Sequence, residues 1–148
     1  MPCSFSCSRR RPAFSASSAL AHIRPSTSSR HCGQADERYF GAVYDPANYV
    51  FCGYDPWKGW QLTREWTVHF HIKDWVHGEP HGRVAGEGQG RIEEVMAEAV
   101  HRGYDGYATM EPHLLGGGPT GGVTGPELFP KAVAAYMRIL DKVGAQYQ

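Results

Sequence analysis

Three residues of this chain have side chains that commonly bind divalent metal ions, and each stands at or next to the end of a β-rich segment. They are Asp45, His71 and Glu111. Two carboxylates and one imidazole suit Mn²⁺, Mg²⁺ or Co²⁺, whereas zinc is less favoured at a site with one nitrogen and no sulfur donor. If the segments are parallel strands, their carboxyl ends meet at one edge of the sheet. We then expect the three side chains to share one ion.

Each of these residues also has an ordinary structural interpretation. Asp45-Pro46 is a common way to open a turn, and Glu111-Pro112 is a common way to end a strand. A histidine at a strand end is more often a hydrogen-bonded surface residue than a metal ligand. Because such residues stand at equivalent places on three successive predicted strands, a shared metal site is favoured over chance. The residues alone still leave both interpretations open.

The elements that must position these residues alternate between strand and helix. Apolar and polar residues alternate strictly over 67–72, which predicts a strand with His71 on the face opposite to Phe70. A capping box of Thr124 and Glu127 predicts the start of the last helix. This order of elements predicts parallel strands and an α/β fold. The other predicted strands are 39–44 and 106–111. The predicted helices are one of about ten residues that starts at Pro56, one over 91–102, and one from Thr124 to Val143.

The first 37 residues differ in composition from the rest. All nine serines lie between Ser4 and Ser29, and no Asp or Glu occurs before Asp36. A Ser- and Arg-rich, acid-free segment is typical of a transit peptide, of a disordered tail or of the product of an upstream frame error, and the sequence leaves its origin open. We expect residues 1–37 to be disordered and without chemistry, and residues 38–148 to form the folded part.

Charge and hydropathy argue against some classes of partner. From Gly41 onward the chain has nine Lys and Arg against 13 Asp and Glu, a formal charge of −4, which disfavours a protein that grips nucleic acid. No stretch approaches the ~20 apolar residues of a membrane-spanning helix. Four cysteines are too few for a disulfide scaffold. We expect a cytoplasmic protein that binds neither nucleic acid nor membranes.

Four short motifs, taken in order, carry a resemblance to a known family. As an ordered set they resemble the sugar phosphate isomerase/epimerase family, whose members are xylose-isomerase-like (β/α)₈ barrels. The resemblance runs from about Tyr39 to about Val143. It implies a partial TIM barrel that comprises about the last three βα units. The motifs are Asp45-Pro46-Ala47-Asn48, His69-Phe70-His71-Ile72-Lys73-Asp74, Gly86-Glu87-Gly88 and Met110-Glu111-Pro112-His113.

The resemblance implies a set of metal ligands and a reaction. In the family, one metal is held by Glu, Asp, His and Glu from four strands. Asp45 resembles that Asp, His71 that His, and Glu111 the last Glu, which also serves as an acid/base group. The first Glu has no counterpart, because no acidic residue precedes Asp36. The implied function is a sugar or sugar phosphate isomerase or epimerase that moves a proton through an enediolate with help from the metal. Whether such a truncated chain is active alone stays open.

Five further residues are candidates for contacts with a sugar or sugar phosphate. His69 is expected to line the barrel lumen, where a packed, hydrogen-bonded histidine is the alternative. Asn48 stands where ketose epimerases of the family have a substrate-contacting His. Lys73, Arg83 and Glu87 could bind hydroxyl groups or a phosphate, and for each the alternative is a solvated loop charge.

The glycine-rich run 86–90 superficially resembles a nucleotide-binding loop. It lacks the Lys-Ser/Thr pair of a P-loop and the glycine spacing of the dinucleotide fingerprint. We therefore expect no nucleotide at this loop.

Other functions compete with the isomerase interpretation. A full barrel takes ~250 residues, so the chain could be a non-catalytic fragment. Its first and last strands would then be exposed edges that self-associate or pair with a complementary half-barrel. In the same superfamily, a dehydratase of the inosose type would use the same metal and proton abstraction. An AP endonuclease-like metal hydrolase would need several zinc ions and more histidines.

Overall fold

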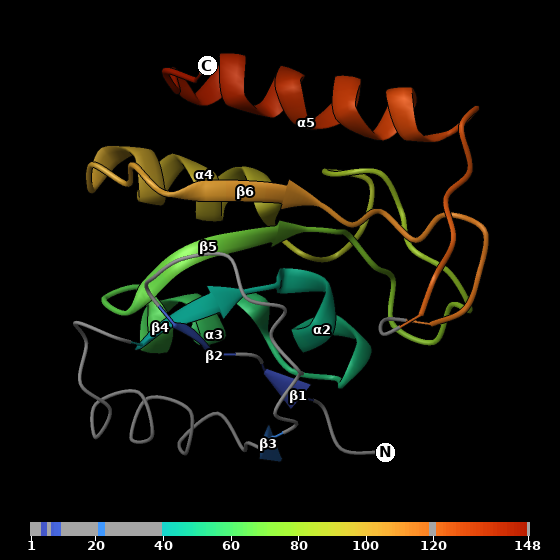
Figure 1. The fold of residues 1–148 in the computed structure, drawn as a ribbon, viewed down its shortest axis with the longest axis horizontal. Coiled ribbons are helices and arrows are strands. Elements are labelled where there is room, and N and C mark those ends of the chain that lie inside the picture. The colour runs from blue at the N-terminus through green and yellow to red at the C-terminus, as the bar shows by residue number, and fades with distance from the viewer. Residues whose placement is uncertain (1–3, 6, 10–20, 23–39, 119–120, 148) are drawn as a thin grey trace.

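The computed structural model describes residues 4–5, 7–9, 21–22, 40–118 and 121–147. Its centre is a sheet of three parallel strands in the order β4-β5-β6. These strands are β4 (Phe40–Tyr44), β5 (Thr67–Ile72) and β6 (Tyr107–Met110). All three arrows point the same way in Figure 1, so the carboxyl ends of the strands lie at one edge of the sheet. The parallel order predicted from the sequence is confirmed.

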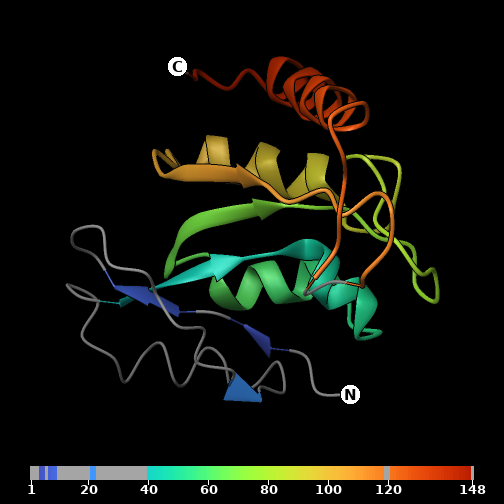
Figure 2. The same ribbon diagram turned by 45° about the vertical axis from the view of Figure 1, so that its right-hand side comes forward.

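The described residues contain four helices between and after these strands. α3 and α4 lie on one side of the sheet, and α5 runs alongside α4 (Figures 1 and 2). None of the helices in the described ranges is both long enough and apolar enough to cross a lipid bilayer. The helices are α2 (Pro46–Phe51), α3 (Pro56–Thr63), α4 (Ile92–His101) and α5 (Phe129–Val143).

The main hydrophobic core lies between the sheet and these helices. Tyr44 of β4 and Phe70 of β5 pack against Trp60 of α3. Because successive residues of a strand point to opposite faces, burial of Phe70 leaves His69 and His71 half-buried on the other face. The core therefore fixes β5 in a rotation that presents both histidines on one surface. The rest of this core cluster is Tyr49, Ile72, Ala85, Ile92, Val95, Met96, Ala99, Tyr136, Ile139 and Leu140.

The chain after β4 differs from the prediction. The sequence predicts only a turn at Asp45-Pro46, but α2 begins at Pro46 directly after the strand. Asp45 is the N-cap of α2, and its carboxylate accepts a hydrogen bond from the Asn48 backbone N–H. Pro46 is tolerated in the first turn because its missing N–H would have no helical partner there. A helix of six residues is too short to show a helical period in the sequence.

The start of α5 also differs from the prediction. The capping box of Thr124 and Glu127 does not form, because α5 begins only at Phe129, with Leu128 as an N-cap that makes no side-chain hydrogen bond. The Thr124 hydroxyl accepts a hydrogen bond from the Leu114 backbone N–H instead. Thr124 therefore closes the glycine-rich loop that precedes α5.

Part of the first 37 residues forms short strands. β1 (Ser4–Phe5) pairs antiparallel with β3 (Ala21–His22), and β2 (Cys7–Arg9) pairs antiparallel with β4. At these residues the structure has strands in place of the expected disorder. The pairing with β2 satisfies backbone groups of β4 that an edge strand would leave unpaired. For the rest of 1–37 the expectation lies outside the described residues.

Candidate metal centre

Three side chains converge at the carboxyl edge of the sheet. Asp45 directly follows β4, His71 is the penultimate residue of β5, and Glu111 directly follows β6. Because the strands are parallel neighbours with His71 opposite Thr109, their ends bring one ligand atom of each residue within 4.8 Å of the others. The structure thus gathers the three residues that the sequence singles out.

Asp45 is the buried member of this cluster. Its Oδ1 accepts the Asn48 backbone N–H at 3.2 Å, which orients the carboxylate at the start of α2. Its Oδ2 is paired with the Lys73 ammonium, whose Nζ atom lies 2.9 Å away as an ion pair and hydrogen-bond donor. Burial raises the pKa of Asp45, and the nearby Lys73 ammonium opposes that rise.

His71 and Glu111 form the more open half of the cluster. His71 Nδ1 lies 3.3 Å from Glu111 Oε2, and the Glu111 side chain is 35% exposed. The hydrogen bond with His71 lowers the pKa of Glu111 to about 2, against the opposing effect of partial burial. Glu111 is therefore an ionised carboxylate that solvent or a small molecule can reach.

Lys73 lies in the middle of the cluster. It comes just after β5, and its side chain is 1% exposed. Its Nζ atom lies 2.9 Å from Asp45 Oδ2 and 3.5 Å from Glu111 Oε2. The sequence predicts Lys73 as a contact for substrate, and the structure adds that its ammonium joins the two carboxylates of the centre.

Two of the other predicted contact residues border the cluster. His69 Nε2 lies 2.7 Å from Thr109 Oγ1, and the His69 ring is 5.4 Å from the His71 ring at an angle of 85°. Burial and the neighbouring His71 both lower the pKa of His69. Asn48, in the first turn of α2, has a buried Oδ1 atom without a hydrogen-bond partner among the described residues.

The last two predicted contact residues have other surroundings. Arg83 makes a two-pronged ion pair with Glu79, with Nε 2.7 Å from one carboxylate oxygen and Nη2 2.6 Å from the other. Glu87 belongs to a turn in which its backbone N–H donates to Val84 O. Glu87 is not one of the three metal-ligating residues that converge at Asp45. A role of Arg83 and Glu87 in contacting a substrate stays a prediction.

Asp74 has a structural role that the sequence does not reveal. Its carboxylate is fully buried and accepts the backbone N–H groups of Trp75, Gly86, Gly88 and Gly90 at 2.8 to 3.0 Å. A Cβ atom on Gly88 would stand 2.3 Å from Asp74 Oδ1, so glycine is needed at that position. The glycine-rich loop thus wraps around the chain's own carboxylate, next to Lys73.

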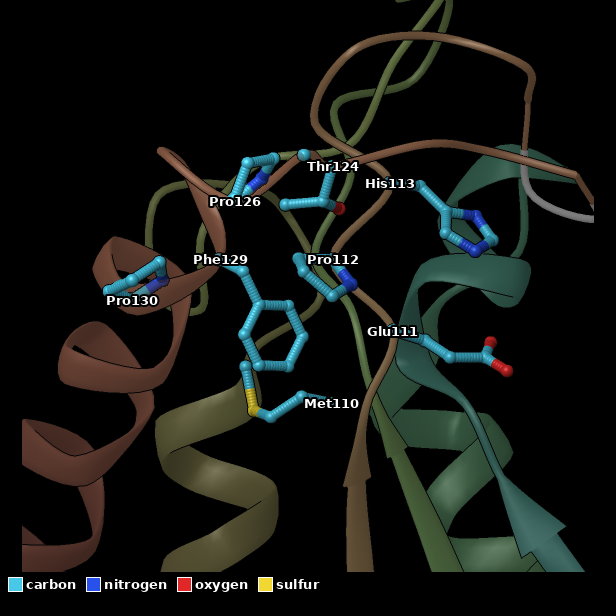
Figure 3. A pocket seen from close by; sticks show the side chains of 9 residues that line it. Met110, Glu111, Pro112, His113, Thr124, Pro126, Phe129 and Pro130 are labelled. Atoms are coloured by element: carbon cyan, nitrogen blue, oxygen red, sulfur yellow. The ribbon is translucent and has the colours of Figure 1, made fainter.

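His113 is a second residue whose place the sequence does not predict. It adopts a positive φ of 48°, and its Nδ1 lies 3.2 Å from Gly118 O. Burial and the Lys73 charge lower the pKa of His113. In Figure 3, His113 and Glu111 lie on the same side of the chain that leaves β6. Membership of the Met110–His113 motif is the signal that could have marked it as a residue near the site.

A pocket of about 560 Å³ lies on the other side of that chain, between the end of β6 and the start of α5. Figure 3 shows Phe129 next to Met110 and Pro112, while the Glu111 carboxylate points away from them. The pocket is also lined by Glu111, His113, Thr124, Gly125, Pro126 and Pro130. The pocket is therefore a largely apolar depression that adjoins the charged cluster at Glu111.

The charged cluster fits a divalent cation. Two carboxylates and one imidazole are the donors that Mn²⁺, Mg²⁺ or Co²⁺ accept, and three protein ligands leave positions for water or substrate oxygens. The buried Asp45 Oδ2 already has a positive partner in the Lys73 ammonium, which shows that this oxygen lies in a place that holds a cation. The residues present therefore agree with the metal that the family resemblance implies.

Comparison with known proteins supports the fold. No protein-family model matches the chain, and no curated protein matches it in sequence. Among solved structures, the crystal structure of a xylose isomerase domain protein from Planctomyces limnophilus is similar, with a TM-score of 0.55 and 19% sequence identity. The match covers 70% of this chain and 37% of that chain.

At this level of identity the similarity is one of fold. The chain spans 37% of the length of the structure that it matches. The parallel strands and the helices that follow them are consistent with part of a TIM barrel. The chain is thus a mixed α/β protein whose fold is similar to part of a xylose isomerase-like barrel.

Proposed function

We propose that this chain supplies the metal-binding and proton-transferring residues of a sugar or sugar phosphate isomerase or epimerase. The proposal rests on the ligand atoms of Asp45, His71 and Glu111, which lie within 4.8 Å of one another at the carboxyl edge of a parallel sheet. That edge carries the active site in TIM-barrel enzymes. The metal is Mn²⁺, Mg²⁺ or Co²⁺ rather than Zn²⁺, because oxygen donors outnumber nitrogen donors.

Glu111 is the proposed acid/base group. Its pKa of about 2 keeps it ionised at neutral pH, the form that accepts a proton, but makes it a weak base, so proton removal from the carbon next to a carbonyl would depend on the metal. His71 holds the carboxylate through Nδ1 at 3.3 Å. A bound metal ion would polarise the carbonyl and stabilise the negative charge that develops when the proton leaves.

Three neighbours of the cluster are the proposed contacts for sugar hydroxyl groups. The buried Asn48 Oδ1 has no hydrogen-bond partner among the described residues and can accept a hydrogen bond from a sugar hydroxyl group. The Lys73 ammonium is a donor at the centre, and a His69 ring nitrogen pairs with the Thr109 hydroxyl beside it. Arg83, which is ion-paired with Glu79, and Glu87 stay proposed contacts for hydroxyl groups or a phosphate of the substrate.

Deuterium uptake by candidate sugars tests the proposal. The protein is incubated in D₂O with Mn²⁺ and a series of ketoses and ketose phosphates, the metal is chelated, and deuterium on carbon is read by mass spectrometry. We expect uptake next to the carbonyl and formation of the isomer or epimer. Glu111→Gln should slow uptake by ~10²–10⁴-fold, whereas Glu127→Gln, at an exposed position before α5, should leave it unchanged.

The result that contradicts the proposal is the absence of uptake with every metal and sugar, or uptake that Glu111→Gln does not reduce. A dehydratase of the same superfamily would give a different outcome in the same samples. It would release water, so the product would be lighter than the substrate by the mass of water, ~18 mass units. Proton abstraction would still depend on Glu111.

A second candidate function is a non-catalytic barrel fragment that associates through its sheet. The observation that favours it is the outer side of β6, which has no strand neighbour within the described residues. Tyr107 of β6 is 80% exposed and lies on the same face of the sheet as Glu111. Exposed edges and aromatic surfaces of this kind invite pairing with another copy or with a complementary half-barrel. Such a chain would self-associate but would exchange no sugar proton when alone.

A further inference from the structure

The centre already contains a positive charge supplied by the chain. The Lys73 Nζ atom lies 2.9 Å from Asp45 Oδ2 and 3.5 Å from Glu111 Oε2, between the two carboxylates that would ligate a metal. The two carboxylates and the ammonium together carry a net charge of −1. A divalent ion added to that set would make the centre positive.

The ammonium and its carboxylate partner are both buried. The Lys73 side chain is 1% exposed and that of Asp45 is 4% exposed, so both charges of the pair are out of water. Buried charges keep close partners because desolvation is expensive, and removing one partner leaves the other uncompensated. Among the described residues, the Lys73 ammonium is the positive group that faces Asp45 Oδ2 at 2.9 Å.

We propose that the Lys73 ammonium is the resident cation of this centre and competes with a divalent metal ion for Asp45 Oδ2. Asp45 Oδ1 accepts the Asn48 N–H, so Oδ2 is the oxygen that faces the centre, and two cations at that oxygen would repel each other. Metal binding therefore requires the ammonium to move away from Asp45. The consequence is a loosely held, exchangeable metal, with a centre that stays charge-paired and folded when no metal is bound.

This inference rests on the proposed metal-binding role of the cluster but not on any catalysed reaction. Its test is therefore metal affinity. Mn²⁺ is titrated into the wild-type chain, Lys73→Met, Lys73→Gln and the control Lys131→Met, and free Mn²⁺ is measured by electron paramagnetic resonance. Lys131 is an exposed lysine on α5, so its loss removes the same charge away from the centre.

We expect Lys73→Met and Lys73→Gln to bind Mn²⁺ about tenfold more tightly than the wild type, or more, because the competing charge is gone. Lys131→Met should bind as the wild type does. In circular dichroism melts, Mn²⁺ should raise the Tm of the Lys73 variants more than that of the wild type. Equal or weaker binding by the Lys73 variants overturns the inference, and so does the absence of Mn²⁺ binding in every variant.

A measurement on the unaltered chain covers the case in which the Lys73 variants do not fold. The Lys73 Cε–Hε signals are followed by NMR during a titration with diamagnetic Mg²⁺. We expect them to shift in step with metal binding, since the ammonium leaves Asp45, while the Lys131 signals stay in place. Binding of Mg²⁺ without any shift at Lys73 overturns the inference. If metal affinity behaves as expected but no sugar proton exchanges, the proposed function fails while this inference stands.

Discussion

At the scale of single residues, Asp45 has two roles that make its carboxylate difficult to replace. One oxygen caps α2 through the Asn48 N–H, and the other faces the Lys73 ammonium at 2.9 Å in a buried environment. The helix-capping hydrogen bond and the buried ion pair of Asp45 together hold the start of α2 next to the proposed centre. Changes at Asp45 should therefore affect stability even without metal.

Asp45→Asn tests this double role. Asparagine keeps the helix cap but removes the charge opposite Lys73, and an uncompensated buried charge costs about 3–5 kcal/mol. We expect the free energy of unfolding in urea to fall by about that amount. Asp55→Asn is the matched control, because Asp55 caps α3 in the same way at an exposed position. Its effect should stay within about 0.5 kcal/mol. Equal losses in the two variants would contradict the assigned ion pair.

The low pKa of Glu111 predicts a dependence of stability on pH. Its folded-state pKa of about 2 lies below the ordinary value of 4.5, so the ionised carboxylate stabilises the folded chain. That contribution is complete above about pH 4.5 and is lost as the pH falls toward 2. In urea titrations without metal, the stability advantage of the wild type over Glu111→Gln should shrink as the pH falls through this window. An advantage that is constant or grows toward low pH would contradict the His71–Glu111 contact.

The sequence predicts the members of the site better than their pairings. Asp45, His71 and Glu111 are found because each ends a strand, and parallel strands bring their ends together. The position of the Lys73 ammonium between two carboxylates is not predictable, because the sequence does not show into which space a side chain just after a strand extends. Arg83 is predicted as a contact for the substrate, and in the structure its guanidinium forms an ion pair with Glu79, four residues earlier.

At the scale of elements, the loop between β5 and α4 is organised by one buried carboxylate. Asp74 accepts four backbone N–H groups, and three of them come from Gly86, Gly88 and Gly90. Such a ring of N–H donors resembles the nests that bind anions in other proteins, with the anion supplied by the chain. Lys73 directly precedes Asp74, so the hydrogen bonds that hold this loop also fix the backbone of Lys73.

Asp74→Ala should disorder this loop. The change leaves four buried or half-buried donors without an acceptor, at about 1–3 kcal/mol for each group that water cannot reach. We expect a loss of several kcal/mol in urea unfolding and faster amide hydrogen exchange at Gly86, Gly88 and Gly90. Asp105→Ala, at an exposed position before β6, is the control and should change neither. Unchanged exchange at the three glycines would show that the loop does not depend on Asp74.

The predictability of an element depends on its length and on whether its pattern is local. β5 has the predicted bounds, because six residues in strict alternation are a strong signal. α2 is missed because it is short and begins at a proline after a strand. The capping box is wrong because Thr124 bonds to Leu114, ten residues earlier in the chain. The Asp74 nest is equally non-local, since its glycine donors lie 12 to 16 residues away.

At the scale of the whole molecule, the two edges of the parallel sheet differ. β4 is paired with β2, whereas β6 has no outer neighbour among the described residues. The match to a xylose isomerase domain protein covers 37% of that chain, in agreement with a sheet that does not close into a barrel by itself. An open edge with an exposed Tyr107 is a surface suited to association.

Light scattering with size exclusion tests association through this edge. We expect the apparent mass to rise with protein concentration and to fall when Tyr107→Lys places a charge beside the edge of β6. Leu62→Lys, at an exposed apolar position on α3, is the control and should leave the mass unchanged. A wild-type chain that stays monomeric at all concentrations would contradict association through β6.

The shared metal site is tested most directly by counting bound Mn²⁺ with electron paramagnetic resonance, in the wild type and in Asp45→Asn, His71→Gln and Glu111→Gln. With the three ligands around one ion, the wild type should bind one weakly held Mn²⁺ per chain, each of the three variants should lose it, and His101→Gln, at an exposed histidine of α4, should keep it. A wild type that binds no Mn²⁺, or binding that survives all three ligand substitutions, would contradict the shared site.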